Sequence, residues 1–278
     1  MQRIKLIFFI AFLSLISCKK DITAFFNHAS IETRVEESLS FPGLVSGEVS
    51  IDTTDFKFAV FSDIHTTEES FHTLDQLGQD VIKYDIDFLI VAGDLTENGL
   101  ELEYSRSRKN LWELGIPYYV TIGNHDLYQK DGWSTWMKYY GPSVYSIRIS
   151  NYIQLIFIDS ASGSVGKTQL RWLEGELKTC LPNTIVVSHY PIYNGISPSI
   201  WRLSSSEERY RITSLLRDYN VMAYISGHYH SFEHHDLSGL DHFIVGSMYP
   251  ESLDSGTRGY LLCSFKNGQF DWQKIGVE

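Results

Sequence analysis

The sequence predicts a large α/β domain, and three observations support this prediction. The chain has 278 residues, of which 43% are hydrophobic and 14% aromatic, so it can bury a sizeable core without a disulfide or a structural metal. Short apolar runs alternate with longer amphipathic stretches, as strands and helices do in α/β proteins. Five of these runs lead directly into short polar clusters, and ligand sites of α/β sheets gather beyond the carboxyl ends of the strands.

The acidic balance of the chain excludes some classes of partner. The formal net charge is −11, whereas proteins that bind nucleic acids or anionic membranes without specificity carry basic surfaces. We therefore expect no nucleic-acid partner. A small anionic substrate stays compatible with this charge, because bound metal ions can reverse the local field.

The first residues have the features of a bacterial lipoprotein signal peptide. Arg3 and Lys5 precede an apolar run over residues 6–16, which is short for a membrane span. The run ends in Leu-Ile-Ser-Cys at residues 15–18, which resembles a lipobox. The sequence thus predicts a signal peptide over residues 1–17, lipidation of Cys18, and an extracytoplasmic protein anchored to a bacterial membrane. An uncleaved anchor or a buried N-terminal helix is the alternative.

The stretch that follows is polar and weakly periodic, and we interpret residues 18–50 as a tether with a lead-in strand. Residues 51–278 then form the main domain. If Cys18 is lipidated, Cys180 and Cys263 are the remaining cysteines. They fit either two free thiols or one disulfide.

The periodicity predicts the elements of the main domain in order. Strands are expected at residues 56–61, 88–92, 118–122, 153–158, 184–187 and 222–226. Helices are expected at residues 68–85, 100–114, from 169 onward and 204–219. The first helix would bury one stripe, formed by Phe71, Leu74, Leu77, Val81 and Ile82. From residue 243 the chain alternates like a β-meander, with turns at Gly256, Gly259 and Asn267-Gly268.

The polar clusters at the strand ends carry candidate metal ligands. Side chains two positions apart in an extended segment point the same way, so Asp63 with His65, and His228 with His230, can each grip one ion. Asp94 follows a glycine and can bridge two cations, because its oxygens diverge. The pooled set is Asp63, His65, Asp94, Asn124, His189, His228 and His230. Seven nitrogen and oxygen ligands without a thiolate suit two neighbouring divalent or trivalent transition metals.

Other motifs have simpler explanations. Residues 161–168 contain the Gly-Lys-Thr of a phosphate-binding loop, but they begin with Ala161 instead of glycine. His234, His235 and His242 lack accompanying carboxylates and are interpreted as surface or supporting histidines. The aromatic residues 133–140 are interpreted as packing. The segment 193–210, with Trp201 and Arg202, is either a substrate-side loop or a surface connection.

Together the clusters resemble the five ordered motifs of the calcineurin-like metallophosphoesterases. The motifs are Asp63-x-His65, Gly93-Asp94, Gly123-Asn124-His125-Asp126, Ser188-His189 and Gly227-His228-x-His230. Asp159-Ser160 followed by Gln169-Leu170-x-Trp172-Leu173 also resembles that family and accounts better for the loop at 161–168. The resemblance implies a four-layer α/β/β/α sandwich of two mixed sheets flanked by helices, with two metals at the strand ends.

The resemblance also implies a role for each residue. Asp63, His65 and His230 would hold one metal, and Asn124, His189 and His228 the other. Asp94 would bridge the metals. His125 would stabilise the transition state or protonate the leaving oxygen, and Asp126 would orient its ring.

The implied activity is hydrolysis of a small phosphoester by in-line attack of a hydroxide that bridges two ions of Mn, Fe or Zn. The segment 93–104 is similar to the branch with cyclic-nucleotide phosphodiesterases, which favours a diester. No tyrosine is placed to be the charge-transfer ligand of purple acid phosphatases. A phosphomonoesterase or nucleotidase of the same fold is the alternative. A non-catalytic scaffold is a third possibility, although no histidine or aspartate of the motifs is missing.

Overall fold

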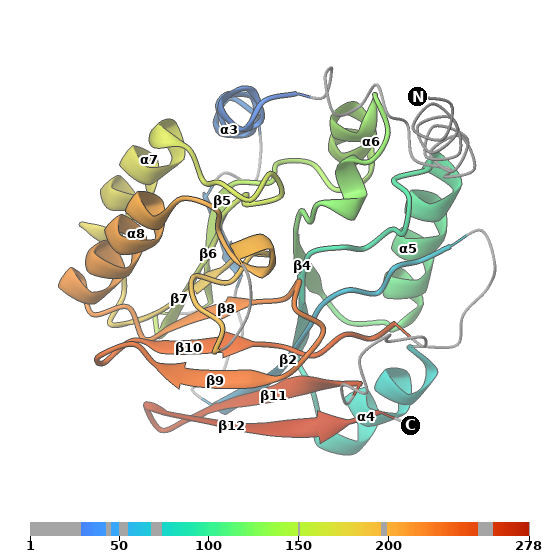
Figure 1. Ribbon diagram of the computed structural model, residues 1–278. Coiled ribbons are helices and arrows are strands. Elements are labelled where there is room, and N and C mark those ends of the chain that lie inside the picture. The colour runs from blue at the N-terminus through green and yellow to red at the C-terminus, as the bar shows by residue number, and fades with distance from the viewer. Residues whose placement is uncertain are drawn as a thin grey trace, which may run out of the picture.

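Two β-sheets lie face to face, and helices cover their outer surfaces (Figure 1). The computed structural model describes residues 29–42, 46–49, 55–67, 74–149, 151–195, 199–249 and 258–277. The two sheets belong to a four-layer α/β/β/α sandwich, which confirms the predicted fold class. Since both sheets mix parallel and antiparallel pairs, the sheets are mixed as expected.

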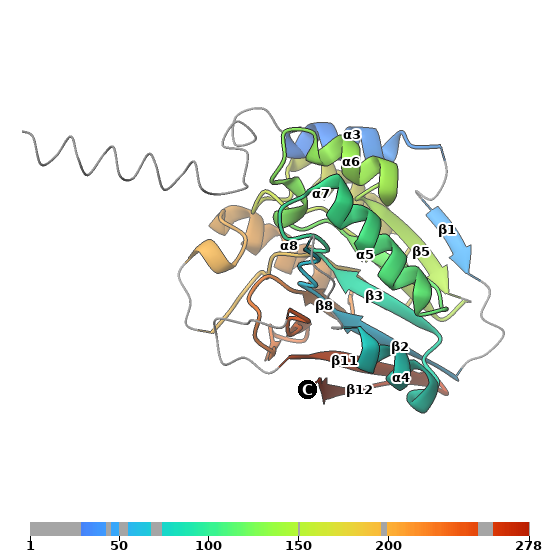
Figure 2. The same cartoon turned by 90° about the vertical axis from the view of Figure 1, so that its right-hand side faces the viewer.

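The first sheet has seven strands in the order β1-β5-β6-β7-β8-β10-β9. Their bounds are β1 Ser46–Val49, β5 Tyr145–Ile149, β6 Ile153–Phe157, β7 Asn183–Val187, β8 Ala223–Ser226, β10 Asp241–Ile244 and β9 Glu233–Asp236. The lead-in strand β1 pairs with β5 at the edge, as Figure 2 shows. The strands β6, β7, β8 and β10 run parallel, so their carboxyl ends lie at one edge of the sheet.

The second sheet has five strands in the order β12-β11-β2-β3-β4. Their bounds are β12 Gln269–Gly276, β11 Gly259–Lys266, β2 Asp55–Phe61, β3 Phe88–Ala92 and β4 Tyr118–Thr121. β2, β3 and β4 are parallel neighbours. The side chains of β2 alternate, as a strand buried on both faces requires. Phe56, Phe58 and Val60 enter the core between the sheets, whereas Ala59 and Phe61 pack toward the helices.

The helices form the two outer layers. Their bounds are α3 Ile31–Leu39, α4 Asp75–Tyr84, α5 Glu101–Glu113, α6 Gly132–Tyr139, α7 Lys167–Leu177 and α8 Ser206–Asp218, with 3-10 turns at His125–Leu127 and Ser199–Trp201. Residues of α4, α5 and α6 share a buried cluster with the outer face of the five-stranded sheet. Residues of α7 and α8 pack in the same way on the seven-stranded sheet. The aromatic segment 133–140 forms α6, and Trp136 is fully buried, which confirms its packing role.

Part of the predicted tether is a helix bound to the domain. In α3, Arg34 is fully buried and donates to both oxygens of Asp159, at 2.8 and 2.9 Å. Glu37 accepts a hydrogen bond from the indole of Trp133. The segment escaped prediction because its nine residues bury few apolar side chains and rely on this ion pair instead.

The loop that mimics a phosphate-binding motif is filled by the chain's own carboxylates. The backbone N–H groups of Lys167 and Thr168 donate to Glu32, at 2.9 and 3.3 Å. The N–H groups of Val165 and Gly166 donate to Glu208, at 3.3 and 3.2 Å. These glutamates occupy the place that a bound anion would take at the start of α7. Their negative charge therefore stabilises the helix.

Two details differ from the prediction. Ile82 is 84% exposed, so it is not on the buried stripe of α4, which begins at Asp75. Residues 68–73 of the predicted helix lie outside the described part. The C-terminal region is also not one meander, because β10 joins the first sheet while β11 and β12 join the second. Gly259 begins β11, whereas Asn267-Gly268 is the expected turn.

The termini and cysteines complete the comparison. The predicted signal peptide and Cys18 fall outside the described residues, as does Gly256. Within the part of the chain that is described, no helix combines the length and apolar character needed to cross a bilayer. Cys180 and Cys263 are both free thiols, packed in separate clusters on either side of the first sheet.

Candidate metal centre

The predicted ligands converge on the edge where both sheets present the carboxyl ends of parallel strands. Asp63 and His65 follow β2, Asp94 follows β3, and Asn124 follows β4. His189 follows β7, and His228 and His230 follow β8. Three loops of one sheet and two loops of the other thus build one site, as the position of the clusters predicted.

Asp63, His65 and His230 form what we call the first ligand group. Each can offer one ligand atom, and these atoms lie within 4.8 Å of one another. His230 Nε2 is 3.2 Å from Asp63 Oδ1 and 3.2 Å from His65 Nε2. Asp63 and His65 are almost fully buried, so the three groups face a protected point.

Asp94, His189 and His228 form the second ligand group, again with ligand atoms within 4.8 Å. Asn124 adjoins it, with its Oδ1 3.1 Å from His189 Nε2. Backbone carbonyls hold the remaining ring nitrogens. His189 Nδ1 is 2.8 Å from Ala92 O, and His228 Nε2 is 3.3 Å from Ile200 O. Such bonds fix the orientation of a ligating imidazole.

One oxygen of Asp94 joins the two groups. Its Oδ2 is 3.8 Å from His65 Nε2 and 3.1 Å from His189 Nε2. Its Oδ1 instead accepts a hydrogen bond from the backbone N–H of His125 at 2.8 Å. A single oxygen of Asp94 thus faces both ligand groups, whereas we predicted that its two oxygens would diverge toward two cations.

The ligand loops hold an unusual backbone. Asp63, His65, Asp94, His228 and His230 all have φ between 48 and 68°. This left-handed conformation is uncommon outside glycine and is found where the surrounding structure imposes it. Here the imposing contacts include the N–H groups of Asp63 and His65, which donate to the carbonyls of Gly93 and Asp94. The pairs Asp63 with His65 and His228 with His230 therefore meet in left-handed backbone, and not in the extended segments that we predicted.

Glycines let these loops approach one another. A Cβ on Gly93 would lie 2.3 Å from His189 Nδ1, and a Cβ on Gly123 would lie 2.1 Å from Asp94 Oδ1. Both distances are far below van der Waals contact. The close packing of the ligand loops therefore requires glycine at positions 93 and 123.

The donor set fits bound cations. Asp63 Oδ1 is buried and makes no well-aligned hydrogen bond, although His230 Nε2 lies 3.2 Å away and a buried carboxylate oxygen normally has such a bond. Nitrogen and oxygen ligands without thiolate match Mn, Fe or Zn in a catalytic setting. The geometry therefore supports metal binding at both groups.

Electrostatics supports the same assignment. Burial alone would raise the pKa of Asp63, but His230 and His65 hold that pKa well below its usual range. Burial opposes a charge on His65 and His189, yet the neighbouring carboxylates raise the pKa of His65 to about 10 and that of His189 to about 9. The buried carboxylates therefore favour positive charge in the centre, and bound metal cations can supply it.

A comparison with known families decides the identity. The sequence model of the calcineurin-like phosphoesterase family matches residues 56–232. This match covers more than half of the chain and includes all seven candidate ligands. The chain belongs to the calcineurin-like phosphoesterase family.

Curated relatives of this chain carry phosphodiesterase names. It is 29% identical over 156 residues to a probable glycerophosphodiester phosphodiesterase of Arcobacter nitrofigilis, covering 52% of this chain and 56% of the relative. It is 33% identical over 121 residues to a probable cyclic nucleotide phosphodiesterase of Synechococcus, covering 40% and 45%. A 3',5'-cyclic-nucleotide phosphodiesterase of Nostoc is 30% identical over 179 residues, covering 60% and 64%. The chain therefore spans less than two thirds of these relatives.

Solved structures share the fold. Purple acid phosphatase PPD1 of yellow lupin has a TM-score of 0.65 at 16% identity, covering 79% of this chain and 51% of its own. A dimetal phosphatase from Danio rerio has a TM-score of 0.62 at 12% identity, covering 80% and 96%. GAP50, the anchor in the inner membrane complex of Plasmodium, has a TM-score of 0.64 at 18% identity, covering 80% and 84%. At these identities the similarity shows the fold alone.

His125 lies beside the first ligand group, with its ring centroid 4.3 Å from that of His65, and it is partly exposed. Its Nδ1 is 2.8 Å from the backbone oxygen of Glu97, which leaves Nε2 available to a substrate. Burial is the main reason that its pKa falls below the ordinary histidine value, although Asp94 opposes this. A mainly neutral imidazole can exchange a proton near neutral pH.

Glu97, and not Asp126, contacts the ring of His125. The Asp126 carboxylate accepts hydrogen bonds from the N–H and hydroxyl of Thr96 and from the N–H of Gly123, so it braces two ligand loops. Burial and the charge of Asp94 raise the pKa of Asp126 to about 7. The predicted role of Asp126 in orienting His125 is thus not the contact observed.

Glu97 also supports the first ligand group. Its Oε2 lies 2.8 Å from His65 Nδ1 and 3.6 Å from His125 Nδ1. The sequence reasoning gave it no role, because a glutamate in a polar loop is usually solvated. Its position three residues after Asp94, within the same tight loop, was the available signal.

His234, His235 and His242 lie outside both ligand groups. His234 and His235 are close to the surface as expected, but each has a carboxylate partner, Asp241 and Glu233 respectively, so the prediction that they lack carboxylates is wrong. His242 is fully buried, so it is not a surface residue. Its Nε2 accepts a hydrogen bond from the N–H of Ile192 at 3.3 Å.

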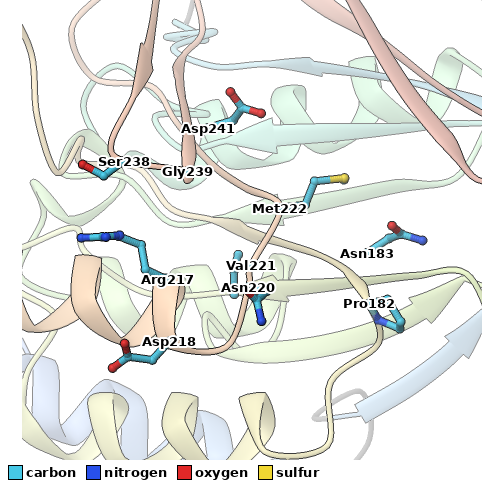
Figure 3. Close-up of a pocket in the computed structure, with 10 residues that line it drawn as sticks. All are labelled: Pro182, Asn183, Arg217, Asp218, Asn220, Val221, Met222, Ser238, Gly239 and Asp241. Atoms are coloured by element: carbon cyan, nitrogen blue, oxygen red, sulfur yellow. The ribbon is translucent and has the colours of Figure 1, made fainter.

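A depression of 580 Å³ lies at the opposite ends of the strands (Figure 3). Asn183, Met222 and Asp241 line it where β7, β8 and β10 begin, and Arg217 and Asp218 line it from the end of α8. It shares no residue with either ligand group. The depression is thus separate from the candidate metal centre at the carboxyl ends of the strands.

Proposed function

We propose that the chain is a dinuclear-metal-dependent phosphodiesterase. The observation that carries this proposal is the position of Asp94 Oδ2, which faces both His65 and His189. A shared carboxylate oxygen brings two cations close enough to act on one phosphoryl group. The first ligand group would hold one cation, and the second group with Asn124 would hold the other.

When bound, two such cations would neutralise the phosphoryl oxygens and lower the pKa of the water that attacks phosphorus. The residues of the chain fix the geometry of this step. Ala92, Ile200 and Glu97 hold ligand imidazoles from behind, so the centre is formed before substrate arrives.

His125 would complete the reaction on the substrate side. Water adds to phosphorus, the P–O bond to the leaving group breaks, and the leaving oxygen takes up a proton. Glu97 holds Nδ1 of His125, so Nε2 is the atom that stabilises the phosphoryl oxygens or delivers this proton.

The names of the curated relatives support a diester substrate over a monoester. The test compares bis-p-nitrophenyl phosphate with p-nitrophenyl phosphate, using the purified full chain with Mn²⁺ and a chelator control. We expect metal-dependent release that is faster from the diester. A preference for the monoester would identify a phosphomonoesterase or nucleotidase, and no release from either would favour a scaffold.

The same preparation tests the centre itself. Elemental analysis should find two metal ions per chain, and their identity selects among Mn, Fe and Zn. The His125→Ala variant should keep its metals and fold but lose most turnover. Full activity of this variant would exclude the assigned role.

We further propose that Cys18 carries a lipid that anchors the protein outside the cytoplasm of a bacterium. The charged start, the apolar run and the lipobox-like residues 15–18 support this proposal. Labelled palmitate should be incorporated into the wild type and not into Cys18→Ser. If the label is absent and the variant fractionates unchanged, the location is wrong.

A further inference from the structure

Three exposed apolar side chains border the metal centre, and we call Tyr193, Ile200 and Trp201 the rim. Ile200 is 66% exposed and Trp201 is 37% exposed, and both belong to the 3-10 turn that precedes α8. Tyr193 is 39% exposed on the same segment, where its neighbour Asn194 donates to Trp201 O at 3.4 Å. The carbonyl of Ile200 is 3.3 Å from His228 Nε2, so the rim lies beside the second ligand group.

The start of the described chain lies on the same side of the molecule. The carbonyl of Ala29 accepts a hydrogen bond from Arg34, and Arg34 also donates to Ser162 Oγ at 3.0 Å. The carbonyl of Gly163, the next residue, accepts two hydrogen bonds from Ser204, both at 2.9 Å. Ser204 stands between the 3-10 turn of the rim and α8. A short series of direct contacts therefore links Ala29 to the rim.

The proposed lipid anchor gives this position a consequence. Residues 19–28 separate Cys18 from Ala29, and a chain of ten residues spans at most about 35 Å. A lipid on Cys18 would keep Ala29 within about that distance of the bilayer, and the rim lies on the same side of the molecule. Tryptophan and tyrosine are enriched at membrane surfaces, where the ring contacts apolar groups and its polar end meets water.

We propose that the rim docks on the surface of the lipid bilayer, with Ile200 and Trp201 in contact with the lipids and the metal centre open toward the membrane. This inference rests on the proposed anchoring through Cys18. The net charge of −11 provides no attraction to an anionic leaflet, so the contact depends on burial of the apolar side chains. Such a contact adds to the affinity of the lipid and fixes the orientation of the domain.

The far end of the molecule offers a competing surface. Ile82 is 84% exposed and Trp112 is 77% exposed, so exposure alone would favour that end. Ile82 lies near the end of α4 and Trp112 near the end of α5, just before the chain enters β3 and β4 at their amino ends. Figures 1 and 2 show α3, which closely follows Ala29, at the top of the molecule and α4 at the bottom. The position of the anchor therefore favours the rim, and Ile82 and Trp112 serve as matched controls.

Fluorescence quenching tests which end meets the lipids. The lipidated full chain is reconstituted in phosphatidylcholine vesicles whose acyl chains carry bromine, which quenches a tryptophan that touches them. We expect part of the tryptophan fluorescence to be quenched. Trp201→Phe should lose most of this quenched part, whereas Trp112→Phe should keep it.

Transfer between vesicles measures the strength of the attachment. The double variant Ile200→Ser with Trp201→Ser should move from donor to acceptor vesicles about 10-fold faster than the wild type, because less apolar surface is buried in the bilayer. The double variant Ile82→Ser with Trp112→Ser loses the same two kinds of side chain and should transfer at the rate of the wild type. Circular dichroism checks that both variants are folded.

The outcomes separate the membrane contact from the anchor and from the catalytic activity. Quenching that disappears in Trp112→Phe and persists in Trp201→Phe would overturn the rim contact and assign the far end to the bilayer. A lipidated chain without quenching, or a rim variant with unchanged transfer, would overturn the contact and leave the anchor standing.

A chain without lipid would overturn both the anchoring and the rim contact. The phosphodiesterase proposal is independent of these results, because bis-p-nitrophenyl phosphate is hydrolysed in solution without vesicles. Failure of that assay beside quenching through Trp201 would remove the proposed activity and keep the membrane contact.

Discussion

The two ligand groups differ in what stands behind their histidines. In the first group, a carboxylate of Glu97 holds His65 Nδ1. In the second group, neutral carbonyls of Ala92 and Ile200 hold the imidazoles. The ligands themselves follow the same division. The first group contains Asp63, whereas Asn124 is the corresponding oxygen donor of the second.

The centre is therefore electrostatically asymmetric, with more negative charge near the first group than near the second. Asp63, Glu97 and the shared Asp94 lie close to the imidazoles of the first group. On the second group, Asp94 lies close to His189, while Asp63 accepts a hydrogen bond from the N–H of His228 and adds a weaker attraction. A carboxylate behind a ligand imidazole makes it a stronger donor. We therefore expect the first group to bind its cation more tightly and the second group to exchange its cation more readily.

The largest effect should come from the residue that the groups share. Asp94→Asn keeps the shape of the side chain but removes its charge from both groups. We expect loss of metal from both positions and a fall in kcat/KM of about 10³-fold or more, because several kcal/mol of stabilisation disappear. Elemental analysis and the diester assay measure this, and circular dichroism controls for folding. A variant with two metals and full activity would contradict the shared role.

A smaller and one-sided effect should follow from Glu97→Gln. The amide still accepts a hydrogen bond from His65 but no longer adds negative charge. Affinity at the first group should fall about 10- to 100-fold, while the second group changes little. Competition titrations with Mn²⁺ and a chelating dye would resolve the two affinities, and equal weakening of both groups would break the comparison.

Asn124→Ala provides the reciprocal test. It removes a neutral ligand from the second group and leaves the carboxylates of the first group untouched. The metal affinity of the second group should fall about 10-fold, which is within the range of about 10- to 100-fold given above for the loss of a supporting residue. The same titration measures both metal affinities. If the affinity of the first group falls as much as that of the second, the two sites are not independent.

The smallest effect concerns stability and spares both groups. Burial lowers the pKa of His242 to about 3, with His235 and His234 adding repulsion. An unfolded histidine titrates near 6.5, so protons bind the unfolded chain more readily as pH falls from 6.5 toward 3. The free energy of unfolding should drop by about 2 kcal/mol between pH 7 and 5 from this residue.

Replacement of His242 by glutamine tests this expectation. The Gln oxygen can still accept from Ile192 N–H, so the variant should fold but lose this part of the acid sensitivity. Urea titrations at pH 7 and 5 measure the free energy of unfolding of the wild type and of the variant, and thus how much stability each loses on acidification. If wild type and His242→Gln lose equal stability on acidification, the buried histidine is not responsible.

The sequence allowed the strands and the ligand set to be predicted for a physical reason. Buried parallel strands are continuous apolar runs, and their carboxyl ends must meet, so Asp63, Asp94 and His189 could be assigned to one place. Long-range pairing was not accessible in the same way. The division of β10 and β11 between two sheets depends on which edge each strand reaches, and their local alternation is the same in either sheet.

Contacts of single polar side chains were the least predictable. Asp126 and Glu97 are both carboxylates in loops at strand ends, and only the backbone path decides which one meets the ring of His125. Arg34 shows the same limit. Nothing in a nine-residue polar helix indicates that one arginine will be fully buried against a partner 125 residues away.

The ion pair of Arg34 and Asp159 has a practical consequence for the smallest unit that can fold. A chain trimmed to residues 51–278 would leave Asp159 inside the protein without its counter-charge, a defect that costs about 3–5 kcal/mol when one partner of a buried pair is removed. The next residue, Ser160, accepts hydrogen bonds from the N–H groups of His189 and Tyr190. A chain that starts after α3 should therefore be less stable to unfolding and should bind metal poorly. A chain that starts at or before Ala29 should avoid both faults.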